Sequence, residues 1–396
     1  MKILQLCNKS PLPPREGGSI AMYHLANALI EDGHHVDMLA VTTPKFSHNQ
    51  KMADDFNSSN SSFDYCFIDT TVHFLGALSS YIQRRPYHVV RFDDDVFRKK
   101  LIQKLKVGNY DLVIFETLYM SPYLKDVREH SKAFCLLRSH NIEHQIWKRI
   151  ATNEKNLFKK HYFNHLTRML RRYEFTMISG FDAIGCISQH EVDYYHSIDT
   201  ECRAEVLPFG LNIAGEFSST GAGKDFYHIG SMDWMPNIEG IRWLIETVVP
   251  ILEKEAPEVR IHLAGRNMPL WLKEVRTPIV VIHGEVDDAT VFASDKLALL
   301  VPLLSGSGIR IKMIEAMAMG KAVIATTTGA EGIDVEHEKN VILADDPLEF
   351  AGAIIRLHTH SDEAQEIGEQ GRSLIFEEHT YKAAILALHS LLKQRI

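Results

Sequence analysis

The chain has 396 residues, 45% of them apolar and 24% charged, and a formal net charge of −8 at pH 7. This length is typical of two or three domains, each large enough to bury a core of its own. The negative charge offers no general attraction for nucleic acid, so we exclude nucleic acid as a partner. The five cysteines form no CxxC pair and no Cys/His cluster. Their pattern predicts a reducing compartment and no structural zinc site.

The N-terminus carries no secretion signal that we can identify. The stretch "MKILQLCNKSPLPP" contains an apolar run that is too short for the apolar region of a signal peptide. No window approaches the roughly 18 continuous apolar residues of a membrane-spanning helix. We therefore expect a cytoplasmic protein.

The first half of the chain alternates strand and helix patterns. A buried-strand pattern at 3–7 is followed by a loop rich in Pro and Gly, and then by apolar residues at helical spacing from Ile20 to Ile30. Gly33 is a plausible end for this helix, and "HVDMLAV" is the next strand. Further strands are predicted at 65–70, 110–116, 133–140, 182–188 and 204–210.

The second half repeats this alternation after a Gly- and Ser-rich stretch, which we interpret as a linker. Helices are predicted at 237–254 and 308–319, and strands at 226–231, 259–265, 279–284, 297–303 and 322–327. Such alternation predicts an α/β protein with two doubly wound parallel sheets, in domains 1–212 and 224–379. Ligands of these folds bind beyond the carboxyl ends of the strands, so we expect a cleft between the two domains. The C-terminal helix, 380–396, could pack back on the first domain.

The segment "VPLLSGSGIRIKMIEAMA" places a glycine-rich turn between a predicted strand and a predicted helix. Gly306 and Gly308 would let the backbone approach a ligand closely, and Ser307 is suited to cap the helix. A helix N-terminus offers unpaired N–H groups and partial positive charge, which favour a phosphate. The turn therefore predicts a phosphate-binding site.

Three charged residues follow this turn. Arg310 and Lys312 fall in the first helical turn, where cations oppose the helix dipole, and a bound diphosphate would explain them. Glu315 lies one turn further on the same face, and its two oxygens suit the vicinal hydroxyls of a ribose. The plain alternative is a surface helix with a Lys312–Glu315 pair, worth at most about 0.5 kcal/mol.

These motifs resemble those of family 4 retaining glycosyltransferases. The resemblance extends from "PREGGSIAMYHLANALIEDGHHV" through "RSHNIEHQIWKR" and "VLPFGLN" to "IGSMDWMPNIEGIRWLIETVVPIL", "HLAG" and the glycine-rich segment. It implies the GT-B fold of two facing Rossmann-like domains, the first on the acceptor side and the second binding the nucleotide sugar. The implied reaction moves a hexose-type sugar from a nucleoside diphosphate to an acceptor hydroxyl with retained configuration. No cofactor or metal is implied beyond the donor substrate.

The sequence departs from the family pattern at two places. Many members carry two glutamates eight positions apart; Glu315 matches the second, the ribose-binding one, whereas Ser307 stands in place of the first. "GSMDWMPN" also lacks the Arg and Lys that many members place after the first strand of the second domain. We expect Arg310 and Lys312 to stabilise the diphosphate instead. A GT-B epimerase or hydrolase, or a nucleotide-sugar-binding protein without transfer activity, remains an alternative.

Two further groups are candidates in the first domain. Gly17 and Gly18 precede the first helix and could admit a donor phosphate or an acceptor, or they could form a plain loop-to-helix turn. His140 ends a predicted strand and is our candidate to hydrogen-bond the transferred sugar or the acceptor. Its neighbours His144 and Glu143 could serve instead, and Glu116 ends the preceding strand in the same way.

Acidic runs in this chain favour helix starts over metal binding. "FDDDV" at 92–96 resembles the metal motif of another glycosyltransferase class, but basic residues flank it. Asp287 and Asp288 also suit a helix N-terminus. We therefore expect no metal site and a reaction that needs no metal ion.

Residues 148–172 form a basic segment that carries eight Lys or Arg and one acid. Apolar residues are interleaved with the cations, as in helices that lie on anionic membranes. A long helix packed on its own domain with solvated charges is the alternative. The resemblance implies a glycan or lipid-linked acceptor in cell-surface polysaccharide synthesis, so peripheral contact with the inner membrane face is also an expectation.

Overall fold

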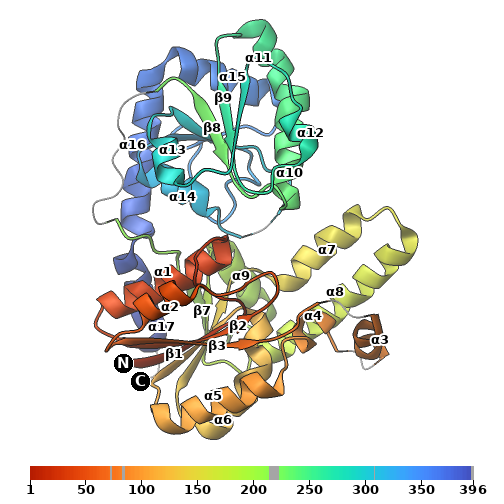
Figure 1. Cartoon of the computed structure of the whole chain (residues 1–396), viewed down its shortest axis with the longest axis vertical. Coiled ribbons are helices and arrows are strands. Elements are labelled where there is room, and N and C mark those ends of the chain that lie inside the picture. Colours follow the sequence, from red (N-terminus) through yellow and green to blue (C-terminus); the bar gives the residue numbers. More distant parts are fainter. Residues whose placement is uncertain (72–73, 83–84, 214–222, 307, 394–396) are drawn as a thin grey trace. The chain divides into compact units, whose positions relative to one another are not determined.

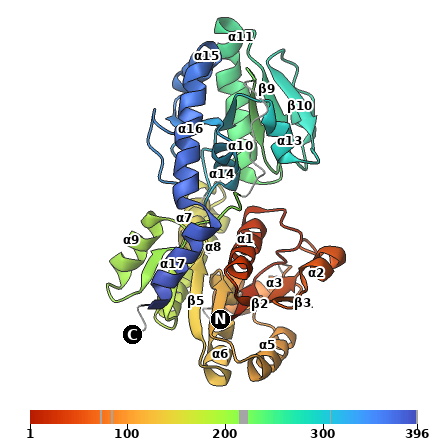
Figure 2. The same cartoon turned by 90° about the vertical axis from the view of Figure 1, so that its left-hand side faces the viewer.

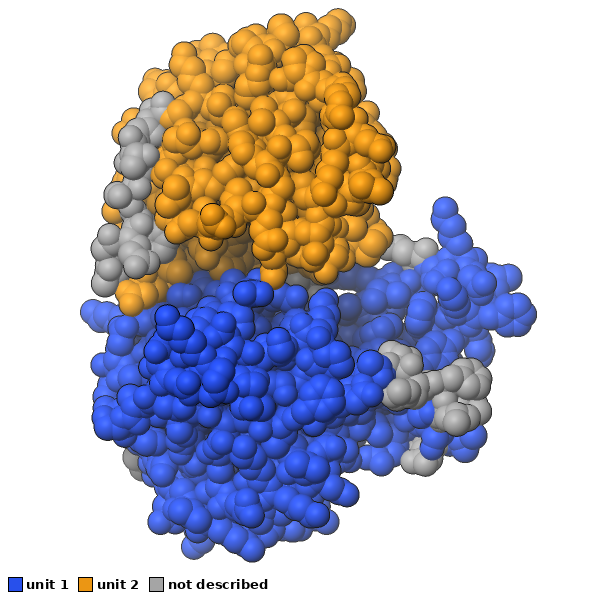
Figure 3. All heavy atoms as spheres, in the orientation of Figure 1, with its two compact units in different colours: residues 1–210, 381–396 blue, residues 211–380 orange. Residues whose placement is uncertain are grey.

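The computed structural model describes residues 1–71, 74–82, 85–213, 223–306 and 308–393. The chain divides into two compact units (Figure 3), which we call unit 1 and unit 2. Unit 1 comprises residues 1–210 and 381–396, and unit 2 comprises residues 211–380. Each unit is a parallel sheet with helices packed on it (Figure 1). No helix among the described residues is both long and apolar enough to cross a membrane.

Unit 1 contains a seven-stranded sheet in the order β3-β2-β1-β4-β5-β6-β7. All of its paired strands are parallel. The strands are β1 (Lys2–Cys7), β2 (His35–Thr42), β3 (Ser61–Phe67), β4 (Leu112–Glu116), β5 (Phe134–Ser139), β6 (Ala183–Cys186) and β7 (Ala204–Val206). The helices are α1 (Gly17–Glu31), α2 (Gln50–Phe56), α3 (Phe74–Ile82), α4 (Tyr87–Val90), α5 (Asp95–Gly108), the 3₁₀ turn η1 (Leu118–Tyr123), α6 (Leu124–His130), α7 (Glu143–Asn153), α8 (Leu157–Ile178), α9 (Gln189–Ile198) and α17 (Tyr381–Lys393).

Alternation along the strands builds a core on each face of this sheet. In β1, Ile3 faces the core formed with α1 and α17, whereas Leu4 and Leu6 face the core formed with α5 and α6. The C-terminal helix α17 contributes Leu388 and lies beside α1 (Figure 2). Helices α7 and α8 pack as an antiparallel hairpin that projects from the rest of unit 1 (Figure 1).

Unit 2 contains a six-stranded parallel sheet in the order β10-β9-β8-β11-β12-β13. Its strands are β8 (Phe226–Ile229), β9 (Ile261–Ala264), β10 (Val280–Gly284), β11 (Ala298–Val301), β12 (Ala322–Ala325) and β13 (Ile342–Leu343). Its helices are α10 (Met235–Trp243), the π-helical turn η2 (Leu244–Val248), α11 (Val249–Glu255), α12 (Leu270–Lys273), α13 (Ala289–Ser294), α14 (Ile311–Ala318), α15 (Pro347–Thr359) and α16 (Ser361–Glu378).

Both sheets have the doubly wound order in which the strand sequence reverses next to the first strand. The reversal lies between β1 and β4 in unit 1 and between β8 and β11 in unit 2. Connections on the two sides of that point run to opposite faces, so a crevice forms there beyond the carboxyl ends of the strands. Cys7 and Glu116 mark this place in unit 1, and Ile229 and Val301 mark it in unit 2.

Several element boundaries differ from the sequence prediction, and two of these differences have a clear cause. The strand predicted at 65–70 is β3, which pairs with β2 already from Ser61. It begins with Ser61 and Ser62, and Asp64 follows the buried Phe63, so this part of the strand does not stand out as an apolar run. The helix predicted from 308 begins at Ile311, because Gly308 has φ +85°, outside the helical region.

Candidate functional site

Three acceptors at and near the carboxyl end of β8 hold the Lys312 ammonium: the Ile229 carbonyl, Asn237 and His228. We call this group the Lys312 seat. The Nζ atom donates to the Ile229 carbonyl and to Asn237 Oδ1, both at 3.0 Å, and lies 3.4 Å from His228 Nε2. His228 Nδ1 is 2.9 Å from the Leu300 carbonyl, which can only accept, so Nδ1 carries the ring proton and Nε2 is free to accept. The three protons of the ammonium therefore have three acceptors. The helix α14 delivers Lys312 to the switch point of the sheet.

This ammonium has no acidic partner among the described residues. Burial, followed by the positive charge of Arg310, lowers the pKa of Lys312 to about 7. Its three acceptors are all neutral groups, since burial lowers the pKa of His228 well below its usual value. A bound anion would favour the charged form of Lys312 and raise its pKa. The seat is thus complementary to a ligand with negative charge.

Gly230 leaves the space that the seat requires. A Cβ atom at this position would lie 2.6 Å from Asn237 Nδ2 and 3.1 Å from Lys312 Nζ. Contacts below 3.0 Å do not occur for real Cβ atoms, so any larger residue would displace Asn237. Sequence reasoning missed Gly230, Asn237 and His228, although the strand–loop–helix pattern of "HIGSMDWMPN" was a usable signal.

Arg310 sits beside the same site at the N-cap of α14. Its side chain is 96% buried, its guanidinium carbon lies 5.4 Å from the centroid of the Trp234 ring, and Nη2 is 3.4 Å from the Thr328 carbonyl. Stacking on the indole holds the cation in place. A Cβ at Gly306, where φ is +111°, would lie 3.1 Å from Arg310 Nη2.

The glycine-rich turn differs in detail from the sequence prediction. Gly306 and Gly308 both have positive φ, which glycine adopts without strain. Ser307 lies outside the described residues. The helix begins three residues after Gly308, and Arg310 is its N-cap residue.

Glu315 lies one turn after Lys312 on α14. Burial raises the pKa of its carboxyl to about 7. Neither a hydrogen bond nor an ion pair accounts for this side chain within the described part of the chain, and Lys312 is engaged by other partners. The alternative of an exposed Lys312–Glu315 surface pair is therefore wrong. A half-buried carboxylate with no partner among the described residues is costly, which points to a ligand that supplies hydrogen-bond donors.

In unit 1, His140 and Glu116 meet at the corresponding place beyond the carboxyl ends of β5 and β4. His140 Nε2 lies 2.6 Å from Glu116 Oε2, and the other carboxylate oxygen accepts from Gln5 Nε2 at 2.6 Å and Arg138 at 3.3 Å. Burial opposes ionisation of Glu116, but the Arg138 guanidinium and the hydrogen bond from His140 hold its pKa at about 2. Glu116 is therefore a carboxylate that can only accept.

This carboxylate fixes the state of the His140 ring. Burial lowers the pKa of His140 although Glu116 opposes that effect, so the ring is neutral near pH 7. Nε2 must carry the proton because Glu116 accepts from it, and Nδ1 is left as an acceptor. A Cβ at Gly18 would lie 3.9 Å from Nδ1, so this atom faces the start of α1. The geometry suits an acceptor for a ligand hydroxyl.

Gly17 and Gly18 lie at the start of α1, whereas His144, an alternative to His140, lies in α7. Gly17 is the exposed first residue of α1, and Gly18 adjoins Lys9, whose Cε would lie 2.9 Å from a Cβ there. His144 is buried with both ring nitrogens engaged, Nδ1 by Glu174 at 2.6 Å and Nε2 by Tyr194 at 2.9 Å. His144 therefore braces α7, α8 and α9 and has no free ring nitrogen for a ligand.

Glu143 is equally buried and accepts from the Tyr119 hydroxyl at 2.7 Å. The acidic runs serve as helix starts, as predicted: Asp94 caps α5 and Asp288 caps α13.

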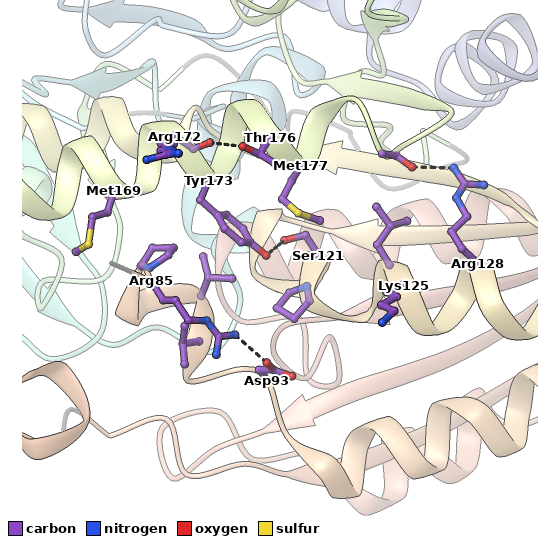
Figure 4. A pocket seen from close by; sticks show the side chains of 16 residues that line it. Arg85, Asp93, Ser121, Lys125, Arg128, Met169, Arg172, Tyr173, Thr176 and Met177 are labelled. Atoms are coloured by element: carbon purple, nitrogen blue, oxygen red, sulfur yellow. Dashed lines mark hydrogen bonds and ion pairs between the residues drawn. The ribbon is translucent and has the colours of Figure 1, made fainter. Parts of the chain in front are cut away.

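Unit 1 also contains a cavity of about 630 Å³ between α4, η1, α6 and α8 (Figure 4). Two pairs of its polar side chains bond to one another. Tyr173 and Ser121 share a hydrogen bond of 2.9 Å, and Arg85 lies 3.3 Å from Asp93. None of the predicted site residues lines this cavity, and we assign it no part in the chemistry.

Residues 223–360, which include the Lys312 seat and Glu315, match the protein family described as "Glycosyl transferases group 1". The whole chain is 23% identical to an uncharacterized 44.6 kDa protein in the cps region of Klebsiella pneumoniae. That alignment covers 96% of this chain and 97% of the relative.

Two solved structures share the architecture. Sucrose-phosphate synthase from Thermosynechococcus elongatus is 17% identical with a TM-score of 0.69, and the match covers 100% of this chain and 99% of that one. Anabaena HepE in complex with UDP and glucose is 14% identical with a TM-score of 0.66, and the match covers 99% of both chains. These likenesses, together with the two parallel sheets, confirm the predicted GT-B fold.

Proposed function

We propose that this protein is a family 4 retaining glycosyltransferase that moves a hexose-type sugar from a nucleoside-diphosphate sugar to an acceptor hydroxyl. The observation that carries the proposal is the Lys312 ammonium, half-buried at the switch point of unit 2 with no acidic partner among the described residues. The match of residues 223–360 to glycosyl transferases group 1 and the GT-B fold support the same conclusion.

Departure of the diphosphate is the step that this site would assist. Negative charge develops on the leaving phosphate oxygen as the bond to the sugar breaks. A fixed cation in a water-poor site stabilises that charge without reorganising at the moment of reaction. Lys312 is held by three acceptors, and Arg310 is held by Trp234, so both meet this requirement.

Lys312 also takes the place of the missing family cations. The family pattern puts Arg and Lys in the loop after the first strand of the second domain, where this chain has "GSMDWMPN". Lys312 Nζ lies 3.0 Å from the Ile229 carbonyl, directly before that loop. We propose that α14 supplies the charge which the loop lacks, and that Glu315 binds the ribose hydroxyls.

In unit 1 we propose that His140 accepts a hydrogen bond from a hydroxyl of the transferred sugar or of the acceptor. Its neutral ring and fixed tautomer make Nδ1 the atom that would accept this hydrogen bond. Glu116 is then a positioning residue, because it touches the ring and not the substrate. Gly17 and Gly18 would leave room for the ligand at the start of α1.

Calorimetric titration and product analysis test the proposal. UDP is the first nucleotide to titrate, with GDP and ADP beside it, because the similar Anabaena structure contains UDP. Incubation of the matching nucleotide sugars with and without acceptor follows. We expect diphosphate release that depends on an acceptor. Release of free sugar without acceptor would indicate a hydrolase. Formation of an epimerised donor would indicate an epimerase, and tight binding without turnover would indicate a binding protein. Each of these outcomes would overturn the transferase proposal.

We further propose that the acceptor is a glycan or a lipid-linked glycan of cell-surface polysaccharide synthesis, reached from the cytoplasmic face of the inner membrane. The α7–α8 hairpin supports this. At its tip Leu157 and Phe158 are 79% and 89% exposed, and exposed Lys155 and Lys159 flank them. Apolar side chains beside cations suit the surface of an anionic membrane.

Vesicle sedimentation distinguishes this contact from a solvated hairpin. Binding to anionic vesicles should fall steeply with salt, because the attraction is screened. Phe158→Glu should weaken it further, whereas Val291→Glu, at an exposed apolar residue of unit 2, should not. Equal binding to neutral and anionic vesicles, or none, would remove the membrane proposal.

A further inference from the structure

Three side chains suited to a metal ion meet at the end of unit 1 opposite the His140 group. Asp32 Oδ2 lies 3.2 Å from His34 Nε2 and 3.5 Å from His389 Nε2. All three ligand atoms lie within 4.8 Å of one another. The imidazole of His34 is 12% exposed and that of His389 37% exposed, so solvent reaches the group.

The chain brings these residues together by a helix-ending turn and by helix packing. Asp32 is the C-cap of α1, and Gly33 follows with φ +81°. The N–H groups of Gly33 and His34 donate to the carbonyls of Ile30 and Leu29, both at 3.0 Å, which is the Schellman pattern. The helix α17 packs beside α1 and adds His389 from the far end of the sequence.

We infer that Asp32, His34 and His389 form a binding site for a divalent transition-metal ion, with Zn²⁺ as the best match. Zinc binds His nitrogen at about 2.0–2.1 Å and carboxylate oxygen at about 2.0–2.2 Å in tetrahedral geometry. Neighbouring ligand atoms of such a site lie roughly 3.4 Å apart, close to the 3.2 and 3.5 Å found here. Only the two imidazoles have to approach, and His389 is exposed enough to turn.

The donor set also selects the metal. Two imidazoles with one carboxylate suit zinc and its neighbours, whereas Ca²⁺ and Mg²⁺ prefer oxygen ligands throughout. Coordination at His34 Nε2 leaves the ring proton on Nδ1. The Met1 amine, 3.3 Å away, can accept a hydrogen bond from Nδ1–H once it has released a proton to solvent. Water completes the fourth position.

The place of the group in the fold indicates a structural role. His34 precedes β2, and His35 pairs with Lys2 at the amino end of β1, whereas the His140 group lies beyond the carboxyl ends of the strands. The 15 residues of α1 separate Gly17 from this group by about 21 Å. A bound ion would tie α17 to α1 and so hold the returning C-terminal segment on unit 1. Sequence reasoning expected no metal cluster because His389 is remote from Asp32 and His34 in the chain.

Metal titration of the full chain, tag-free and freed of metal by chelator, tests the inference. We expect one Zn²⁺ per chain by calorimetry, and Co²⁺ should give the visible absorption of a tetrahedral site. His389→Gln and Asp32→Asn should each weaken zinc binding at least tenfold. His283→Gln is the matched control, because His283 also belongs to a close imidazole pair: its Nε2 lies 2.8 Å from His262 Nδ1.

Exchange of amide hydrogens supplies a second measurement. Zinc should slow exchange across residues 381–393 in the unaltered protein but not in His389→Gln. The inference fails if zinc does not bind, if His283→Gln abolishes binding while His389→Gln does not, or if zinc leaves exchange in 381–393 unchanged.

Discussion

Binding of a nucleoside diphosphate should draw a proton onto Lys312. In the free protein the pKa of Lys312 is lowered to about 7, so at pH 8 only about one tenth of the molecules carry the ammonium. A diphosphate beside Nζ favours the charged form and raises that pKa. Binding at pH 8 should therefore take up about 0.9 proton per nucleotide.

The sign and size of the pH effect follow from the same shift. Above pH 7 the binding-competent ammonium becomes tenfold rarer with each pH unit, so affinity for UDP should fall about 50-fold, or roughly 2.3 kcal/mol, between pH 7 and pH 9. The unfolding free energy of the free protein should change in the opposite direction. The unfolded chain binds the proton up to its higher pKa, so stability rises with pH between about 7 and 10.

Other titrating groups contribute little to the proton uptake at pH 8. Burial raises the pKa of Glu315 to about 7, so this carboxyl is already mostly ionised at pH 8. His228 stays neutral because burial lowers its pKa well below the usual value. The terminal phosphate, with a pKa of roughly 6, is also ionised.

Calorimetry in two buffers of different ionisation enthalpy measures the uptake directly. The binding enthalpy of UDP at pH 8 should differ between phosphate and Tris by the amount that about 0.9 proton requires. Lys312→Met should abolish the difference and weaken binding at pH 7. Glu315→Gln is the matched control and should keep the buffer dependence. An enthalpy independent of buffer, or an unchanged dependence in Lys312→Met, would refute the assignment of Lys312 to the diphosphate.

Three further predictions concern the remaining groups. Glu315→Gln should weaken UDP binding by roughly 1.5–3 kcal/mol. The melting temperature should not fall, since this change breaks no contact with a protein partner among the described residues. Unchanged affinity in the titration would show that Glu315 does not bind the ribose. Glu116→Gln should lower the unfolding free energy by about 3–5 kcal/mol, because the Arg138 guanidinium would stay buried without its carboxylate partner. It should also reduce turnover, because the His140 ring could then adopt either tautomer. Urea unfolding and rate measurements check the two effects, and a loss of unfolding free energy below about 1 kcal/mol would contradict the buried pair. Transfer should survive excess chelator, since cations of the chain serve the diphosphate; a strict Mg²⁺ or Mn²⁺ requirement, restored by adding the ion, would contradict this.

The sequence alone determined the alternation of strands and helices, because apolar runs and helical spacing are local properties. It also predicted a phosphate-binding site at the glycine-rich turn, because this turn lies close to Lys312 and Glu315 within one stretch of sequence. Both glycines indeed have the positive φ that the turn requires. These features depend on residues that are close together in the chain, so sequence patterns are enough to predict them.

Only the tertiary structure decided which groups surround those residues. Asn237 and the Ile229 carbonyl meet Lys312 from another strand and helix, and no local pattern could pair them. The tautomer of His140 likewise depends on Glu116 in the neighbouring strand, and that carboxylate depends on Arg138 for its charge. Protonation states follow from burial and from neighbours brought together by folding, so they become known only when the sheets have formed.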